Sequence, residues 1–118
     1  MITEIAYIGY PVTDMKRSRR FYEEVLGLKP DPQMCDENWV EYNIGPCCTL
    51  ALGKYDGWAP SKDGACVGLE VDDFEATMAK LKAAGVTPQW EPCDTPACKM
   101  ALITDPDGSP LMIHKRKA

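Results

Sequence analysis

The sequence has only one histidine, His114, and no C-x2-C pair. Zinc sites built on the usual Cys and His patterns are therefore excluded, because one histidine cannot complete them. No apolar run approaches the roughly 18 residues that a membrane-spanning helix needs. Positive charge is scarce, with 13 Lys and Arg against 18 Asp and Glu and a net charge of −5. We therefore expect neither nucleic acid nor a membrane surface as a partner.

Cysteine is less abundant than a disulfide-based domain requires. The 6 cysteines are about 5% of the 118 residues, whereas disulfide scaffolds carry more than roughly 8%. Residues 1–4 lack the basic stretch that opens a signal peptide. We therefore expect a cytoplasmic protein with free thiols. Its length is enough for one domain with a core of its own.

Two segments half the chain apart show the same pattern. Residues 5–12 alternate apolar and other side chains, residues 66–71 do the same, and both are typical of half-buried strands. Asp14 follows the first strand and Asp73 the second, each two residues after a valine. Because aspartate is a favoured helix N-cap, each pattern predicts a helix that begins there and ends before a glycine.

Three short strands are predicted after each helix. They cover residues 32–35, 39–44 and 48–52 in the first half, and residues 87–91, 99–104 and 111–115 in the second. We expect one domain over residues 1–118, with a first module at about 1–53, a linker at about 54–64 and a second module at about 65–118. Each module is then a βαβββ unit, which predicts an α+β protein with helices on one face of a sheet.

Three motifs resemble the vicinal oxygen chelate superfamily, which includes glyoxalase I, extradiol dioxygenases and bleomycin-resistance proteins. They are residues 7–14, the helix sequence Phe21-Tyr22 followed by Val25-Leu26-Gly27-Leu28, and the turn at residues 105–109. The resemblance implies two tandem βαβββ modules that form an open, cup-like mixed sheet with helices on its outer face. It also implies a ligand in the cup and a homodimer, with modules either swapped or side by side.

Enzymes of this superfamily usually hold a divalent metal on four inward side chains, mostly His and Glu, from the first, fourth, fifth and eighth strands. The resemblance carries these positions to Tyr7, Ala51, Cys66 and Met112. Alanine has no donor atom, a thioether is a weak soft ligand, and a phenol keeps its proton near neutral pH. We therefore expect no cofactor, and a divalent metal only if the site is relocated.

Strand alternation predicts which side chains line the cup. The ligand-binding candidates are Tyr7, Gly9, Cys66, Gly68, Glu70, Met112 and His114. They form a mostly apolar lining with a few polar groups, which suits a small organic ligand. Trp39, Trp58 and Trp90 are candidate stacking walls whose orientation the pattern does not fix. The sequence favours a protein that binds such a ligand without turnover, as bleomycin-resistance proteins do.

Two alternatives stay open. Glu70 and His114 are candidate acid–base residues or relocated metal ligands, which would make the protein a glyoxalase-like lyase or a dioxygenase. Cys47 of the pair Cys47-Cys48 could instead join Cys66 in a thiol site for a soft ion, helped by Met112 or His114. The structural alternatives are a strand-end glutamate, a histidine on the terminal strand and small buried thiols.

Overall fold

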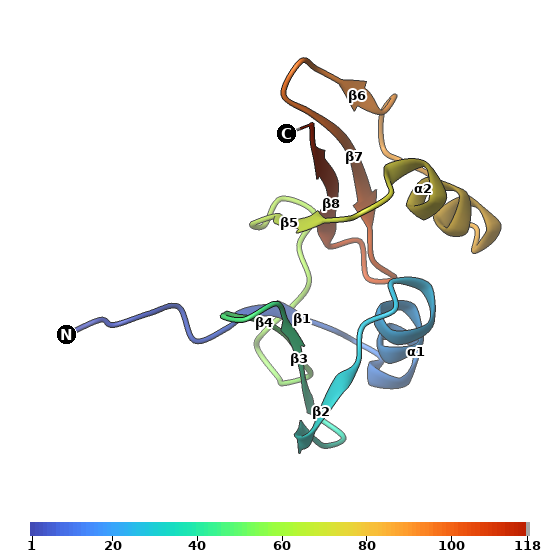
Figure 1. Ribbon diagram of the computed structural model, residues 1–118. Coiled ribbons are helices and arrows are strands. Elements are labelled where there is room, and N and C mark those ends of the chain that lie inside the picture. Colours follow the sequence, from blue (N-terminus) through green and yellow to red (C-terminus); the bar gives the residue numbers. More distant parts are fainter. Residues whose placement is uncertain (118) are drawn as a thin grey trace. The chain divides into compact units, whose positions relative to one another are not determined.

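The computed structural model describes residues 1–117, and the chain divides into two compact units between Pro60 and Ser61. The first unit contains β1 (Ile8–Pro11), α1 (Met15–Arg20), η1 (Phe21–Val25), β2 (Pro30–Cys35), β3 (Trp39–Ile44) and β4 (Cys48–Gly53). The second contains β5 (Val67–Glu70), α2 (Phe74–Ala83), β6 (Cys93–Asp94), β7 (Cys98–Thr104) and β8 (Pro110–Arg116). The βαβββ order predicted for each half is confirmed (Figure 1).

Each unit contains one four-stranded sheet. Sheet A has the order β1-β4-β3-β2, and sheet B has the order β5-β8-β7-β6. The first pair is parallel in both sheets, whereas the other pairs are antiparallel. Both sheets are therefore mixed, and the predicted α+β class is confirmed. No helix in the described part of the chain is long and apolar enough to span a membrane.

Both helices begin at the aspartates that the sequence marks. The carboxylate of Asp14 accepts a hydrogen bond from the backbone N–H of Arg17 at 3.0 Å, and that of Asp73 accepts one from Ala76 at 3.0 Å. Such caps satisfy backbone donors that have no partner within the helix. The first helix differs from the expectation, because α1 continues directly as the π-helical turn η1.

One face of sheet A packs against the first helix. The ring of Tyr22 in η1 stacks on the ring of Tyr42 in β3, with centroids 6.1 Å apart. Both side chains are fully buried. Val40, Leu50 and Leu52 are also buried and share this face, since side chains two apart on a strand point the same way. The opposite face of sheet A, which we call its helix-free face, therefore carries the residues between them.

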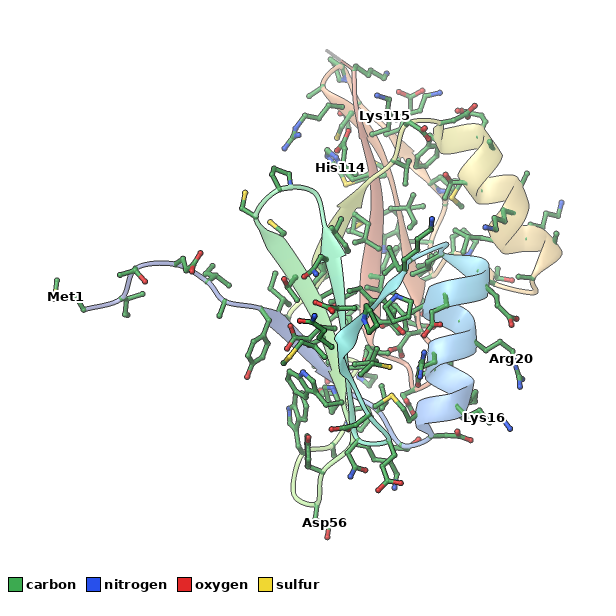
Figure 2. All side chains as sticks on the ribbon, turned by 60° about the horizontal axis from the view of Figure 1, so that its bottom comes forward. Met1, Lys16, Arg20, Asp56, His114 and Lys115 are labelled. Atoms are coloured by element: carbon green, nitrogen blue, oxygen red, sulfur yellow. The ribbon has the colours of Figure 1, made fainter. Side chains whose placement is uncertain are left out.

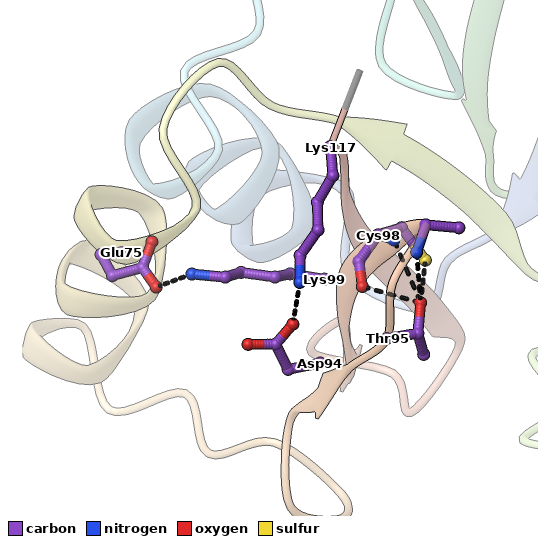
Figure 3. A network of polar contacts seen from close by, with 7 residues as sticks. Glu75, Asp94, Thr95, Cys98, Lys99 and Lys117 are labelled. Carbon is purple, nitrogen blue, oxygen red and sulfur yellow. Dashed lines mark hydrogen bonds and ion pairs between the residues drawn. The ribbon is translucent and has the colours of Figure 1, made fainter.

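Sheet B is arranged in the same way. Its core consists of Ala101, Ile103, Leu111 and Ile113, together with Phe74 and Leu81 of α2. On β7, Lys99 shares a face with Ala101 and reaches Glu75 of α2 at 2.7 Å (Figure 3). This contact identifies the side that α2 covers. The remaining residues of β7 and β8 lie on the helix-free face of sheet B.

The predicted strand at residues 87–91 is wrong. The edge strand of sheet B is instead the two-residue β6, and residues 87–91 run alongside with one backbone hydrogen bond, from Gln89 to Leu102 at 2.8 Å. Pro88 and Pro92 have no N–H to donate, which prevents a regular ladder between them. The short edge is held by Lys117, which pairs with Asp94 (Figure 3).

Candidate functional site

The helix-free face of sheet A carries a group of aromatic rings. Tyr7 precedes β1, Trp39 begins β3, and Tyr55 and Trp58 follow β4. The rings of Tyr7 and Trp39 meet edge to face, with centroids 5.1 Å apart and an interplanar angle of 82°. The rings of Trp39 and Tyr55 lie 6.4 Å apart at 40°. We call these four residues the aromatic face.

Two glycines make room for the fourth ring. A Cβ atom built on Gly53 would lie 2.6 Å from the ring of Trp58 and 3.0 Å from that of Trp39. A Cβ on Gly9 would lie 3.2 Å from the ring of Trp58 and 3.3 Å from that of Tyr7. The Trp58 ring therefore lies directly against the backbone of β1 and β4. No other residue type permits so close an approach.

Three of the four rings of the aromatic face are exposed to solvent. The exposed fraction is 49% for Tyr7, 51% for Tyr55 and 37% for Trp58. Exposed rings that adjoin one another form an apolar patch, and such a patch is typical of a binding surface. Figure 2 shows Asp56 at the tip of the loop that holds Tyr55 and Trp58.

Beneath the rings, the strand positions carry one small and one charged side chain. Ala51 of β4 pairs with Gly9 of β1 on one side and with Glu41 of β3 on the other. Ala51 is fully buried. Glu41 is half-buried, and its carboxylate accepts a hydrogen bond from the indole N–H of Trp39 at 2.8 Å. The face thus combines four aromatic rings with one carboxylate.

On the helix-free face of sheet B, cross-strand pairs bring four of the predicted residues together. Gly68 pairs with Met112, and Glu70 pairs with His114, all on β5 and β8. Met100 of β7 pairs with His114 from the other side. Cys66 lies just before β5 and is exposed. Tyr7 and Gly9 belong to the other unit. The predicted ligand-binding residues are therefore divided between the two units.

Glu70 holds His114 in one orientation. The Nδ1 atom of His114 lies 2.6 Å from one carboxylate oxygen of Glu70, and the backbone N–H of Arg116 donates to the other oxygen at 2.7 Å. These bonds lower the pKa of Glu70, the backbone bond from Arg116 more than the contact with His114. With Nδ1 engaged, the Nε2 atom is the nitrogen left for a substrate. This is the usual geometry of a histidine oriented by a carboxylate.

The two cysteines of the predicted thiol site belong to different units. Cys47 is exposed in the turn before β4 of the first unit, and Cys66 belongs to the second. Burial raises the pKa of the Cys66 thiol, so it is a poorer thiolate than an ordinary cysteine. Within residues 1–117, no three His, Cys, Asp or Glu side chains come together as a set of metal ligands.

A groove of about 470 Å³ lies along α1 in the first unit. In its wall, the Arg19 guanidinium contacts the Glu23 carboxylate at 2.6 Å, and the Tyr42 hydroxyl donates to the same carboxylate at 2.9 Å. Burial raises the pKa of Tyr42, and the bond to Glu23 adds to this. Lys16 and Arg20 project outward from α1 (Figure 2). These polar groups stabilise the joint between helix and sheet.

Sequence reasoning missed Tyr55 of the aromatic face and Glu41 beneath it. Glu41 could have been found, because Trp39, Glu41 and Asn43 alternate with Val40 and Tyr42 along a predicted strand. Tyr55 could not, because the loop after β4 has no periodicity. The structure orients Trp39 and Trp58 on this face, whereas Trp90 lies in the second unit and is 41% exposed.

The sequence matches the family model for the Glyoxalase/Bleomycin resistance protein/Dioxygenase superfamily over residues 4–113. No curated protein matches it. Among solved structures, the antibiotic binding protein TnmS3 from Streptomyces sp. CB03234 is 24% identical, with a TM-score of 0.81 and 98% of each chain covered. A glyoxalase/bleomycin resistance protein from the same organism is 26% identical, with a TM-score of 0.73, 93% of this chain and 98% of that chain covered.

A glyoxalase/dioxygenase from Nostoc punctiforme is similar in fold although it is only 17% identical. Its TM-score is 0.81, and the match covers 98% of this chain and 92% of that chain. The described fold is therefore shared by binding proteins and by enzymes. The chemistry of this chain must be argued from its own residues.

Proposed function

This chain belongs to the Glyoxalase/Bleomycin resistance protein/Dioxygenase superfamily, and from that premise we propose that it binds a small organic ligand on the aromatic face without metal-dependent turnover. The observation that carries the proposal is the group of four rings on the helix-free face of sheet A, three of them more than one-third exposed. Stacking and edge contacts with such rings bind planar or apolar groups.

The superfamily's usual divalent metal does not fit the residues at its expected positions. Ala51 is fully buried and has no donor atom, and Tyr7 already contacts the ring of Trp39. Met112 offers a thioether and Cys66 a thiol whose pKa is raised by burial. Metal-dependent enzymes of the Lewis-acid type need about three protein ligands of suitable hardness. This donor set favours the binding of an organic ligand over metal chemistry.

Similarity in fold supports the same conclusion. TnmS3 is described as an antibiotic binding protein, and its structure matches nearly the whole of this chain. We extend the proposal to a homodimer, as the resemblance implies, and to a cytoplasmic location, which the six free cysteines fit. Light scattering on the purified protein tests the first extension, since a monomer at all concentrations would contradict it.

A thermal-shift screen of planar aromatic compounds tests the proposed function, followed by titration of tryptophan fluorescence with each stabilising compound. Trp58→Ala should weaken binding at least about tenfold, because it removes one wall of the site. Trp90→Ala is the matched control and should bind like the parent. The proposal fails if no compound stabilises the protein, or if both variants bind equally well. It also fails if about one transition metal per chain supports turnover of a hemithioacetal or a catechol.

A second candidate function rests on the contact between Glu70 and His114. An imidazole whose Nδ1 is held by a carboxylate can take a proton from a substrate at Nε2, so this pair could act as a general base. Such an enzyme would lose its reaction in His114→Ala and much of it in Glu70→Gln. Equal rates in both variants and the parent would exclude it.

A further inference from the structure

The carboxylate of Glu41 lies on the helix-free face of sheet A, two residues after Trp39 on β3 and in contact with its indole. Its recorded partner is neutral, the indole N–H of Trp39 at 2.8 Å. Within residues 1–117, no lysine or arginine forms an ion pair with it. A half-buried carboxylate whose partner is a neutral donor is well placed to receive a cationic group, because the described side chains supply no positive charge to it.

The surrounding rings add a second source of negative potential. The ring of Trp39 contacts the rings of Tyr7 and Tyr55, and the ring of Trp58 lies against Gly53, close to Trp39. The face of an aromatic ring is the negative end of its quadrupole and attracts cations within about 6 Å of its centroid. Tryptophan is the strongest of the rings in this respect, and the site contains two.

Resting on the proposed function, we propose that the ligand of the aromatic face carries an organic cation, a quaternary or protonated tertiary amine, for which Glu41 is the counter-ion. One carboxylate among rings is a poor site for a metal ion, which needs several hard donors. A tetraalkylammonium group suits it, because its charge is diffuse and weakly hydrated and its methyl groups pack against rings. The protein's net charge of −5 adds a long-range attraction for a cation.

The test uses two probes of the same shape. The first, para-hydroxyphenyltrimethylammonium, differs from the second, para-tert-butylphenol, only by N⁺ in place of a carbon atom. Binding of each is measured by tryptophan fluorescence at low salt. The parent protein should bind the cation at least about tenfold more tightly than the neutral probe, since cation–π attraction and the charge pair act together.

Two variants of Glu41 and one control variant, Glu24→Gln, assign that preference to Glu41. Glu41→Gln should reduce the preference to about twofold or less, chiefly by weakening the binding of the cation. Glu24→Gln removes the same charge from the exposed surface of η1 and should keep the preference. Glu41→Asp retains the charge and should bind the cation more tightly than Glu41→Gln does. Glu41→Asp, checked for folding by circular dichroism, separates loss of charge from loss of structure.

The outcomes separate this inference from the function on which it rests. Equal affinity for the two probes in the parent overturns the cation inference and leaves small-molecule binding in place. A preference that survives in Glu41→Gln overturns the role of Glu41. If neither probe binds, the cation inference is overturned, and the screen of planar compounds then decides separately on the proposed function.

Discussion

The packing of Trp58 against two glycines predicts a graded response to added methyl groups. In Gly53→Ala, the new Cβ would lie 2.6 Å from the Trp58 ring, whereas carbon atoms in contact are roughly 3.5–4.0 Å apart. The ring must therefore move by about 1 Å or swing away. In Gly9→Ala the same distance is 3.2 Å, so a few tenths of an ångström suffice.

The magnitude follows from this geometry. Overpacking of a tight contact costs about 1–3 kcal/mol. We place Gly53→Ala in the upper half of this range, because rings of both Trp58 and Trp39 block the site. Gly9→Ala should cost about 1 kcal/mol or less. Gly68→Ala is the matched control on β5, where a Cβ would meet nothing within 4 Å. It should change stability by no more than about 0.5 kcal/mol.

Urea unfolding followed by circular dichroism measures the three free energies, and tryptophan emission reports on the ring. Gly53→Ala should also show red-shifted emission, because the displaced indole enters water. The order of destabilisation should be Gly53→Ala, then Gly9→Ala, then Gly68→Ala. If Gly53→Ala were as stable as Gly68→Ala and had the parent's emission, the described position of Trp58 would be refuted.

Three further predictions concern single contacts. Glu70, whose pKa is lowered in the folded state, stabilises the protein above the ordinary pKa of about 4.3 and loses this effect as the pH falls through its lowered folded value. Urea unfolding should therefore show the parent more stable than Glu70→Gln near neutral pH, with the difference vanishing in acid; a difference independent of pH would contradict the contacts of Glu70 with the backbone N–H of Arg116 and with His114. Tyr42→Phe should cost about 1.5 kcal/mol in the same assay, because it removes a part-buried hydrogen bond to the carboxylate of Glu23, and an unchanged midpoint would contradict it. Asp73→Ala should cost about 1 kcal/mol through its lost cap, and less than 0.3 kcal/mol would count against the cap.

Much of the fold could be predicted from the sequence, because local chemistry decides it. Asp14 and Asp73 each follow a strand and cap the helix that comes next. The alternation of apolar and polar side chains predicts strands such as β3. The edge of sheet B could not be predicted from alternation, since Pro88 and Pro92 decide which residues can pair. The π-helical turn η1 has no sequence signature of its own and went unpredicted.

The candidate site was predictable only in part. The alternation on β5 and β8 places Glu70 and His114 on one face, and the register pairs them directly. Their 2.6 Å contact depends on side-chain conformations that no pattern specifies. The aromatic face depends on a loop that folds back, which brings Trp58 onto Gly53 and Gly9. Contacts of this kind join residues without a periodic relation, so they become visible only in three dimensions.

The indole N–H resonances provide the most direct test of ligand binding on the aromatic face. The chain has 3 tryptophans, so a ¹⁵N–¹H correlation spectrum should show one indole signal for each. On titration with the compound that stabilises the protein most in the thermal-shift screen, the signals of Trp39 and Trp58 should move together and saturate. The signal of Trp90 should stay in place. Movement of Trp90 alone, or no movement of Trp39 and Trp58 at saturation, would contradict the account.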